Sequence, residues 1–374
     1  MTHTSSSTPT TLAILFGGRS GEHEVSLMSA RSVLAVVDHT RYNVIEVGIT
    51  HEGAWLTGKD GLAAFEQGQT EALLPASLHP DPTRPGLYVI RNGQYEKYAD
   101  VDVYFPMLHG TYGEDGTMQG LFEMADVAYV GANVIHAAVG MDKGIFKDVM
   151  RANGIPVVEG TIVLRSQIET DIENVVKQAE AVGAYPLFVK PANLGSSVGV
   201  TKCRSRADLV EGLIEAAQYD RRILIERGIH NPREIEIAVL GNHHPQASVA
   251  GEIIPGADFY SYDAKYVLNN SQPVIPAALS ETQAQKIEEI ALRAYRAVDG
   301  CGMSRVDFLL DPQSEEIFLN EINTIPGFTS ISMYPKLWEA SGVPYAALVD
   351  RLIELAIERK EERDHLIRHY RRDA

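Results

Sequence analysis

A short segment near the C-terminal end combines residue types that suit a metal ion. Glu321 and Asn323 lie two apart on a predicted strand, so their side chains point to the same face. Asp307 lies on the preceding predicted strand, 305–310, and the turn-like residues 311–315 join both strands into a hairpin. Two carboxylates and an amide oxygen are hard ligands, suited to Mg²⁺ that bridges phosphates. A solvent-exposed polar edge is the alternative, but apolar flanks would bury these charges, and buried charges need a partner such as a cation.

Lysines lie next to loops of small residues elsewhere in the chain. Lys190 ends a predicted strand and is followed at 195–199 by a Gly- and Ser-rich loop, whose backbone N–H groups can contact phosphate oxygens. Such a loop alone is more often a simple turn, and the Gly-Lys-Ser/Thr pattern of a Walker site is missing. Lys143 and Lys265 also lie near motif loops, and three phosphates need several cations. The lysines together predict a triphosphate site.

Residues 226–229 follow a predicted strand, and Glu234 comes shortly after them. The backbone at 227–229 is suited to contact an adenine edge, and Glu234 to accept hydrogen bonds from ribose hydroxyls. The alternative is that Glu226 and Glu234 are simply two exposed acids. This segment alone favours that alternative.

An aromatic segment, FYSYDAKY at 259–266, also carries Ser, Asp and Lys. Ordinary packing of a strand and turn is one interpretation. The other is a polar lid that excludes water from a reacting centre.

The loop at 17–26 places three ionisable residues, Glu22, His23 and Glu24, at the start of a predicted helix. No G-x-G-x-x-G dinucleotide fingerprint can be written here, so the residues suggest contacts with another ligand. The alternative is an ordinary helix start, capped by Ser20 and stabilised by acids in its first turn.

The elements that carry these segments predict an α/β fold. Alternating strands and helices in the first region favour a doubly wound parallel sheet, whose ligands collect beyond the carboxyl ends of the strands. Residues 52–100 are Gly- and Pro-rich with weak periodicity and indicate a surface insertion. The expected strands are 12–16, 44–49, 101–105, 186–190, 223–226 and 234–240. The expected helices are 25–37, 142–152, 167–182 and 280–298, followed by a charge-rich helical or frayed tail at 359–374.

Composition narrows the class of protein. A length of 374 residues favours two or three domains, and 45% apolar with 22% charged residues is typical of a globular protein. A net charge of −17 argues against a nucleic-acid partner, and no apolar segment is long enough to span a membrane. Residues 1–10 lack the pattern of a secretory signal and suggest a polar tail. Cys203 and Cys301 are too few for a disulfide framework and fit a reducing cytoplasm.

Seven tracts resemble, in the same order, the D-alanine–D-alanine ligase family of the ATP-grasp superfamily. They are GGRSGEHEVSLMSA at 17–30, PMLHGTYGEDGTMQG at 106–120, GMDK at 140–143, VKPANLGSSVGV at 189–200, FYSYDAKY at 259–266, SRVDF at 304–308 and NEINTIPGFTSISMYP at 320–335. Each tract alone is weak, but the set spans nearly the whole chain. The resemblance implies a three-domain ATP-grasp architecture. Residues 10–131 would form the doubly wound, substrate-binding domain, and 132–225 and 226–374 would form two α+β domains that sandwich ATP, the last with the metal site.

The resemblance also implies an activity. ATP would join two D-alanines into D-alanyl-D-alanine through an acyl phosphate, releasing ADP and phosphate, for peptidoglycan precursor synthesis. Two Mg²⁺ or Mn²⁺ ions per site, a homodimer and a cytoplasmic location are implied, and the need for a monovalent cation is left open. Another carboxylate–amine ligase of the same fold is an alternative, against which the 17–30 and 259–266 tracts argue. A non-catalytic nucleotide-binding regulator would be expected to lack a metal ligand or phosphate lysine, and none is missing.

Residue roles follow from the same resemblance. The residues implied to hold ATP are Lys143, Lys190, Lys265, Ser197, Phe259, Glu226, Arg227, Ile229 and Glu234. The implied metal ligands are Asp307, Glu321 and Asn323, with Glu321 between two ions. The implied catalytic and substrate-binding residues are Glu22, His109, Ser196, Tyr266, Arg305, Gly327, Ser332 and Met333.

Within the implied catalytic and substrate-binding set, Glu22 would bind the first ammonium, with His109 nearby, and Glu22, Ser196 and Tyr266 would tie the lid across the site. Tyr at 266 favours an amine nucleophile. Leu194, where an acid is expected, and Met333, where Leu is common, depart from the family pattern.

Overall fold

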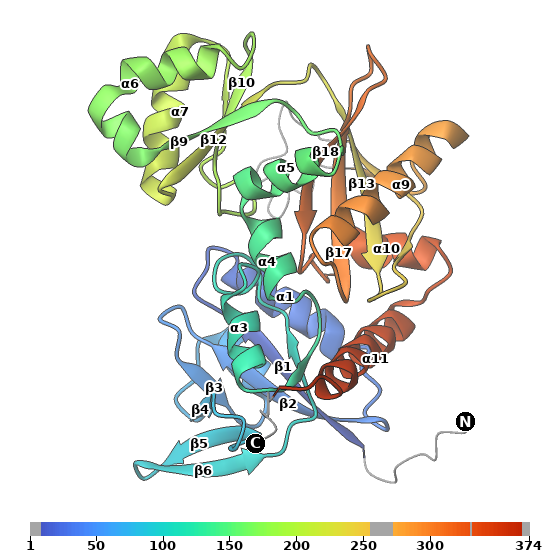
Figure 1. The fold of residues 1–374 in the computed structure, drawn as a ribbon. Coiled ribbons are helices and arrows are strands. Elements are labelled where there is room, and N and C mark those ends of the chain that lie inside the picture. Colours follow the sequence, from blue (N-terminus) through green and yellow to red (C-terminus); the bar gives the residue numbers. More distant parts are fainter. Residues whose placement is uncertain (1–8, 255–271, 330, 369–374) are drawn as a thin grey trace, which may run out of the picture.

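The computed structural model describes residues 9–254, 272–329 and 331–368, and these form three β-sheets with helices packed against them. Figure 1 shows the N-terminal sheet in blue and cyan at the bottom, and the other two sheets side by side above it. Within the described residues, no helix is long and apolar enough to cross a membrane. The three sheets meet where the candidate site lies.

The first sheet is doubly wound where its strands are parallel, as predicted. Its parallel strands are β2 (Tyr42–Ile49), β1 (Thr10–Gly17), β7 (Val103–Pro106) and β8 (Ala128–Tyr129), in that order. Alternate residues of β1 pack against different helices. Leu12, Ile14 and Phe16 share a core with α1 (His23–Leu34), whereas Ala13 and Leu15 share one with α3 (Thr117–Met124). A strand covered on both faces in this way is apolar throughout, which explains the continuous apolar run.

Residues 52–100 are more regular than the sequence indicates. They form β3 (Trp55–Thr57), α2 (Gly61–Gln67), β4 (Leu74–Leu78), β5 (Leu87–Arg91) and β6 (Gln94–Ala99). The strands continue the first sheet in antiparallel order, from β2 outward to β6. They are short and mostly half-exposed, so the sequence carries little periodicity to reveal them.

The second sheet is antiparallel, with the order β11-β10-β12-β9. Its strands are β9 (Gly160–Leu164), β10 (Leu187–Pro191), β11 (Thr201–Cys203) and β12 (Arg222–Arg227). The amphipathic helices α6 (Arg165–Glu180) and α7 (Arg206–Tyr219) share its apolar core. The predicted helix at 167–182 is therefore confirmed with slightly earlier bounds.

The third sheet carries the predicted hairpin. Its strands are β13 (Arg233–Leu240), β14 (Gln246–Ala247), β15 (Gly251–Ile254), β16 (Gln272–Val274), β17 (Met303–Leu310) and β18 (Ile317–Asn323). β17 and β18 pair antiparallel, and Asp307 lies directly opposite Glu321. Helix α9 (Glu281–Ala297) packs on this sheet and begins with the predicted capping box, in which Ser280 accepts from the Gln283 N–H.

Four further helices lie between or after the sheets in the described part of the chain. Helices α4 (Val134–Met141) and α5 (Lys143–Ala152) lead from the first sheet to the upper part of the molecule, and α10 (Met333–Ala340) precedes α11 (Tyr345–Asp364) (Figure 1). Asp142 accepts hydrogen bonds from the N–H groups of Gly144 and Ile145, so it caps the start of α5.

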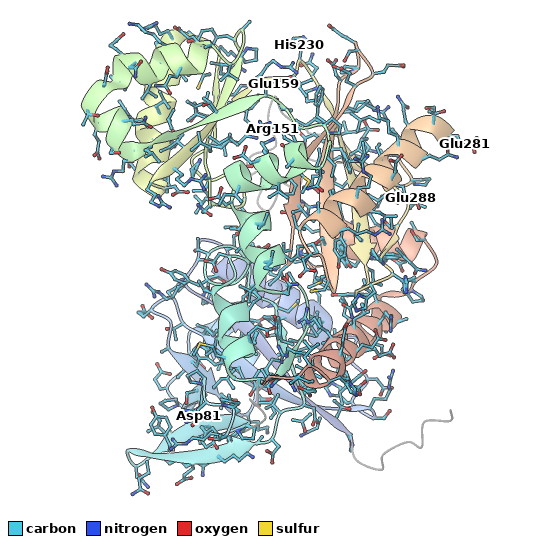
Figure 2. All side chains as sticks on the ribbon, in the orientation of Figure 1. Asp81, Arg151, Glu159, His230, Glu281 and Glu288 are labelled. Atoms are coloured by element: carbon cyan, nitrogen blue, oxygen red, sulfur yellow. The ribbon has the colours of Figure 1, made fainter. Side chains whose placement is uncertain are left out.

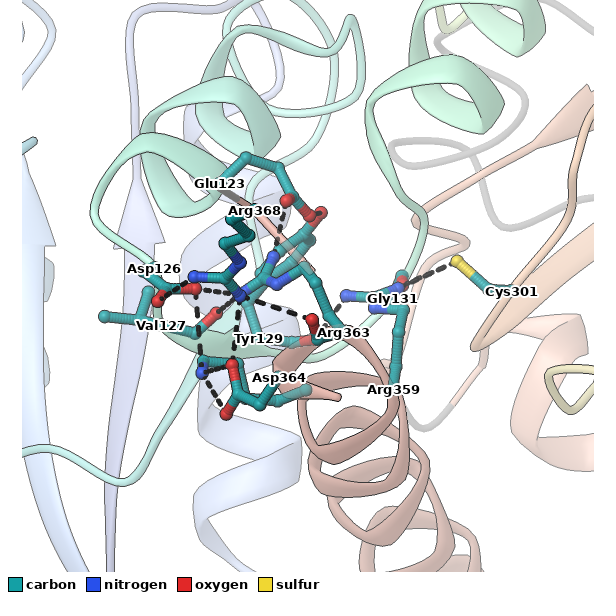
Figure 3. A network of polar contacts seen from close by, with 11 residues as sticks. Glu123, Asp126, Val127, Tyr129, Gly131, Cys301, Arg359, Arg363, Asp364 and Arg368 are labelled. Carbon is teal, nitrogen blue, oxygen red and sulfur yellow. Dashed lines mark hydrogen bonds and ion pairs between the residues drawn. The ribbon is translucent and has the colours of Figure 1, made fainter. Parts of the chain in front are cut away.

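Arginines of the charge-rich C-terminal segment contact residues next to the first sheet (Figure 3). Arg359 donates to the carbonyl oxygens of Tyr129 (2.7 Å) and Gly131 (2.6 Å), and contacts Cys301 Sγ at 2.8 Å. Arg363 lies 2.5 Å from a Glu123 carboxylate oxygen. Because Cys301 precedes β17, this network ties the first sheet to the third.

Acidic side chains account for the negative surface. Figure 2 shows Asp81, Glu159, Glu281 and Glu288 at the outside of the molecule, and all four are exposed. Glu159 accepts from Arg227 Nε at 2.9 Å, and Arg227 is one of the residues that line the cavity described below.

Candidate active site

A cavity of about 880 Å³ lies where the three sheets meet, and residues from each sheet line it. The predicted site residues that line it are Glu22, His109, Lys143, Lys190, Ser196, Ser197, Glu226, Arg227, Ile229, Glu234, Arg305, Glu321, Asn323, Gly327, Ser332 and Met333. Asp307 is not among the lining residues but contacts two of them. Phe259, Lys265 and Tyr266 lie outside the described residues, as does the whole of the predicted lid. Segments far apart in the sequence therefore converge on one volume.

The predicted metal ligands lie together on the β17–β18 hairpin. The Asn323 amide donates to Asp307 Oδ2 at 2.9 Å, and Glu321 faces Asp307 across the ladder. Arg305 donates to both Asp307 oxygens, at 2.8 and 2.7 Å, and lies 3.1 Å from Glu236 Oε2. Sequence reasoning missed Glu236. Two carboxylates and an amide oxygen at one end of a hairpin fit a divalent cation, because all three are hard oxygen donors.

Arg305 is held by acids on both sides. Burial alone would lower the pKa of its guanidinium, but the Asp307 and Glu236 carboxylates raise that pKa well above the ordinary value. The side chain is therefore a fixed positive charge at the cavity wall.

The two described phosphate lysines are anchored differently. Lys143 Nζ donates to the carbonyl oxygen of Leu194 at 2.6 Å, which joins the start of α5 to the Gly- and Ser-rich loop. Lys190, on β10, lies 2.7 Å from Glu226 Oε2. Lys143 and Lys190 both line the cavity.

Glu226 is buried, so the alternative of two exposed acids is wrong for this residue. Its other oxygen, Oε1, lies 2.5 Å from Nζ of Lys147, a buried lysine on α5 that sequence reasoning also missed. Burial would raise the pKa of Glu226, but the two ammonium groups lower it to about 2. The available sequence signal for Lys147 was its spacing of four residues from Lys143, which places both on one side of the helix.

Two loops approach the Glu22 carboxylate closely. Ser196 Oγ donates a hydrogen bond to Glu22 Oε1, which links the first sheet to the loop after β10. A Cβ added at Gly110 or Gly195 would lie only 2.5 or 2.9 Å from Glu22 Oε2. A side chain at either position would therefore displace this carboxylate.

His109 is buried and fixed by hydrogen bonds. Its Nδ1 lies 3.0 Å from the carbonyl oxygen of Ile325, to which it donates, so Nε2 accepts from the Ser29 hydroxyl at 2.8 Å. Burial lowers the pKa of the imidazole, although the Glu22 charge opposes this shift. His109 is therefore a neutral group at the wall near Glu22.

Glu114 is a lining residue that sequence reasoning missed. It accepts from the backbone N–H groups of Gly110 (2.8 Å) and Ile325 (3.2 Å). Burial, together with the nearby Glu22 charge, nevertheless raises the pKa of Glu114 to about 8. Glu114 therefore holds a proton near neutral pH, and its signal in the sequence was its place in the loop after β7.

The remaining end of the cavity is the start of α10. Ser332 directly precedes this helix, and its Oγ accepts from the Thr329 N–H at 3.0 Å rather than from the helix itself. Met333 is the first helical residue. A Cβ added at Gly327 would lie 2.8 Å from Ser332 Oγ. Backbone N–H groups at a helix start suit an anion such as a carboxylate.

Two family models cover most of the chain. The model described as "D-ala D-ala ligase N-terminus" matches residues 11–132, and "D-ala D-ala ligase C-terminus" matches residues 149–354. The D-alanine–D-alanine ligase of Heliobacterium modesticaldum is 50% identical over 353 residues, which are 94% of this chain and 96% of that protein. The chain belongs to the D-alanine–D-alanine ligase family. Members of this family are ATP-dependent ligases that need a divalent metal and make D-alanyl-D-alanine for peptidoglycan synthesis.

Solved structures agree with this assignment. The D-alanine–D-alanine ligase from Coxiella burnetii superposes with a TM-score of 0.80 at 37% identity, covering 95% of this chain and 96% of that one. The VanG D-Ala:D-Ser ligase from Enterococcus faecalis gives a TM-score of 0.83 at 34% identity, covering 93% and 100%. The predicted family, enzyme class and ATP-grasp fold of this D-alanine–D-alanine ligase family member are thus confirmed. The roles of its individual site residues stay predictions.

The glycine beside Glu22 generates a test. Gly110→Ala should raise the KM for D-alanine by roughly tenfold, about 1.4 kcal/mol, because the new Cβ displaces the Glu22 carboxylate. Gly93→Ala is the matched control, since Gly93 has nearly the same φ (+77° against +74°) but no atom within 4 Å of an added Cβ. Both variants should lose about 1 kcal/mol of unfolding free energy from the left-handed backbone. Steady-state kinetics and thermal unfolding check both effects, and an equal KM change in the two variants would contradict the interpretation.

Proposed function

We propose that this protein uses ATP to join two D-alanines into D-alanyl-D-alanine, for peptidoglycan precursor synthesis. The observation that carries the proposal is one cavity lined by Glu22 from the loop after β1, Lys190 from the second sheet and Glu321 from the third. A carboxylate of the first D-alanine attacks the γ-phosphate and releases ADP, which leaves an acyl phosphate. The neutral amine of the second D-alanine then attacks that carbonyl, so a C–N bond forms and phosphate leaves. Phosphoryl transfer of this kind depends mainly on positioning and on positive charge.

ATP would lie between the second and third sheets in this proposal. Lys143, Lys190 and Lys265 would hold the phosphates, with Ser197 in the adjoining loop. The Glu226 carboxylate already binds two lysines, so adenine would be read by the backbone of residues 227–229, near Phe259. The support is that 227, 229 and Glu234 line the same cavity as Lys190.

Asp307, Glu321 and Asn323 would hold two Mg²⁺ or Mn²⁺ ions, with Glu321 between them. When bound, the ions would neutralise charge on the phosphate oxygens. Arg305, fixed by Asp307, would steady the transferring phosphoryl group and, with the Gly327 N–H, the tetrahedral oxyanion.

The two D-alanines would take the other end of the cavity. Glu22 would accept hydrogen bonds from the first ammonium, with His109 beside it, and Ser196 and Tyr266 would complete the set that closes the site. Ser332 and the Met333 backbone would bind the second carboxylate at the start of α10. The support is the buried Glu22 carboxylate at one end and the helix start at the other.

The domain division 10–131, 132–225 and 226–374 belongs to the same proposal, and one sheet lies largely in each part. A cytoplasmic location is supported by the two cysteines, both free and buried. The homodimer follows from the family resemblance alone.

ADP release tests the function directly. D-Alanine alone should give ADP, phosphate and D-alanyl-D-alanine in equal amounts, whereas L-alanine alone should give almost none. D-Alanine supplied with D-lactate should still yield mainly the dipeptide, because Tyr at 266 favours an amine nucleophile. ADP release that does not depend on D-alanine, or that L-alanine supports equally, would refute the proposal.

The metal assignment has its own test. Glu321→Gln keeps the size of the side chain but removes the charge proposed to lie between two cations, so kcat should fall by roughly 100-fold at saturating Mg²⁺. Glu316→Gln removes an exposed acid from the same hairpin and should leave kcat unchanged. Activity of the Glu321 variant close to that of the Glu316 variant, with both folded by circular dichroism, would show that Glu321 is not a metal ligand.

A further inference from the structure

Lys147 is a buried cation close to the ATP end of the cavity but outside its lining. It lies on α5, one turn after Lys143, and its side chain is 2% exposed. Withdrawing an ammonium group from water costs several kcal/mol unless an opposite charge compensates. A lysine retained in such a place therefore needs an explanation.

The compensating charge is shared with a proposed ATP ligand. Lys147 Nζ lies 2.5 Å from Glu226 Oε1, and Lys190 Nζ lies 2.7 Å from Glu226 Oε2. Each oxygen of this one carboxylate is thus taken by a different ammonium group. The side chains of Lys190 and Glu226 line the cavity and are 17% and 4% exposed, whereas Lys147 lies behind them and is 2% exposed. The trio runs from the interior of the protein to the cavity wall.

The net charge of Lys147, Glu226 and Lys190 determines how Lys190 can interact with an anion. Burial lowers the pKa of Lys147, but the Glu226 carboxylate opposes this shift and favours the ammonium form. Two ammonium groups then share one carboxylate, so the trio keeps one net positive charge, and Lys190 is the ammonium group that lines the cavity beside Glu226. Without Lys147, both oxygens of Glu226 would attract Lys190 alone, and a closed one-to-one ion pair would leave no net charge for an anion. Lys147 thus controls both the position and the available charge of Lys190.

We propose that Lys147 is a positioning residue for ATP: it occupies one oxygen of Glu226, so that Glu226 holds Lys190 at the cavity wall with its charge available to phosphate. This inference rests on the proposed role of Lys190 in binding ATP phosphates. Lys147 itself does not touch the nucleotide, so its effect should pass entirely through Glu226.

The protonation of Glu226 gives the trio a distinct pH signature. The charged groups around it are Lys147 and Arg151 from α5 and Lys190 from β10, and the acids Glu234 and Glu321 act on Lys190. The two lysines lower the pKa of Glu226 to about 2 against the effect of burial, so the carboxylate stays ionised throughout the working range. Removing Lys147 takes away one of the two positive charges that lower the pKa of Glu226, so burial raises that pKa. Glu226 then takes up a proton as the pH falls. Lys190 loses its anchor when that happens.

The test is steady-state kinetics of the full-length protein with Lys147→Met and the control Lys177→Met, which makes the same substitution at an exposed lysine of α6. Lys147→Met should raise the KM for ATP about tenfold and leave the KM for D-alanine nearly unchanged, as is typical when the support of a binding residue is lost. When the buffer pH is lowered from 8 to 6, the KM for ATP of this variant should rise further than that of the wild type. Lys147→Arg, which keeps the charge, should restore much of the ATP affinity. Equal KM changes for both substrates, or a pH profile parallel to that of the wild type, would overturn the proposal.

If Lys147→Met alone does not fold, the same substitution can be tested in the Glu226→Gln variant. Glu226→Gln removes the buried carboxylate, so the double variant Lys147→Met, Glu226→Gln keeps only one charge of this trio, that of Lys190 at the cavity wall. Its KM for ATP should equal that of Glu226→Gln alone, because Lys147 acts only through Glu226. A further tenfold rise in the double variant would contradict the proposal. Lys190→Met distinguishes the role of Lys190 from that of Lys147. If Lys190→Met does not change the KM for ATP, Lys190 does not bind phosphate. If Lys190→Met raises this KM strongly and Lys147→Met does not, only the positioning role of Lys147 is refuted.

Discussion

An ionised side chain that is withdrawn from water must find an opposite charge nearby, and this constraint organises the centre of the molecule. The Glu226 carboxylate binds two lysines that come from α5 and β10. The Arg305 guanidinium likewise lies between Asp307 and Glu236. These pairs hold the cavity wall in place, and they leave at that wall the charges that a triphosphate and two amino acids require.

The same pairings determine how the sheets meet. Glu22 and Ser196 join the first sheet to the loop after β10, and the glycines at 110 and 195 let the two loops come close enough. On the far side, Arg359 ties the end of the first sheet to the segment before β17. One contact therefore lies within the cavity and the other stabilises the framework behind it, so the site is built from segments separated by more than a hundred residues.

Local patterns in the sequence predicted the elements that are locally determined. The β17–β18 hairpin and the capping box at Ser280 follow from alternation and turn chemistry, and both are present. The strands of 52–100 escaped prediction because they are short and gain their partners from a sheet edge rather than from their own sequence. Glu114 and Lys147 escaped for a similar reason, since each becomes noteworthy only beside a charge from a distant element, Glu22 and Glu226 respectively. The proposed lid residues around Tyr266 lie outside the described part of the chain, so their roles stay predictions from the family resemblance.

In the proposed reaction, the carboxylate of one D-alanine becomes an acyl phosphate in the cavity before the second D-alanine attacks. Labelling the carboxylate of D-alanine with heavy oxygen tests this most directly, because the attacking oxygen leaves with phosphate when the peptide bond forms. Each phosphate released with a dipeptide should carry a single labelled oxygen, and the other label should remain in the new peptide carbonyl. Unlabelled phosphate, measured by mass spectrometry during dipeptide formation, would contradict the proposed reaction.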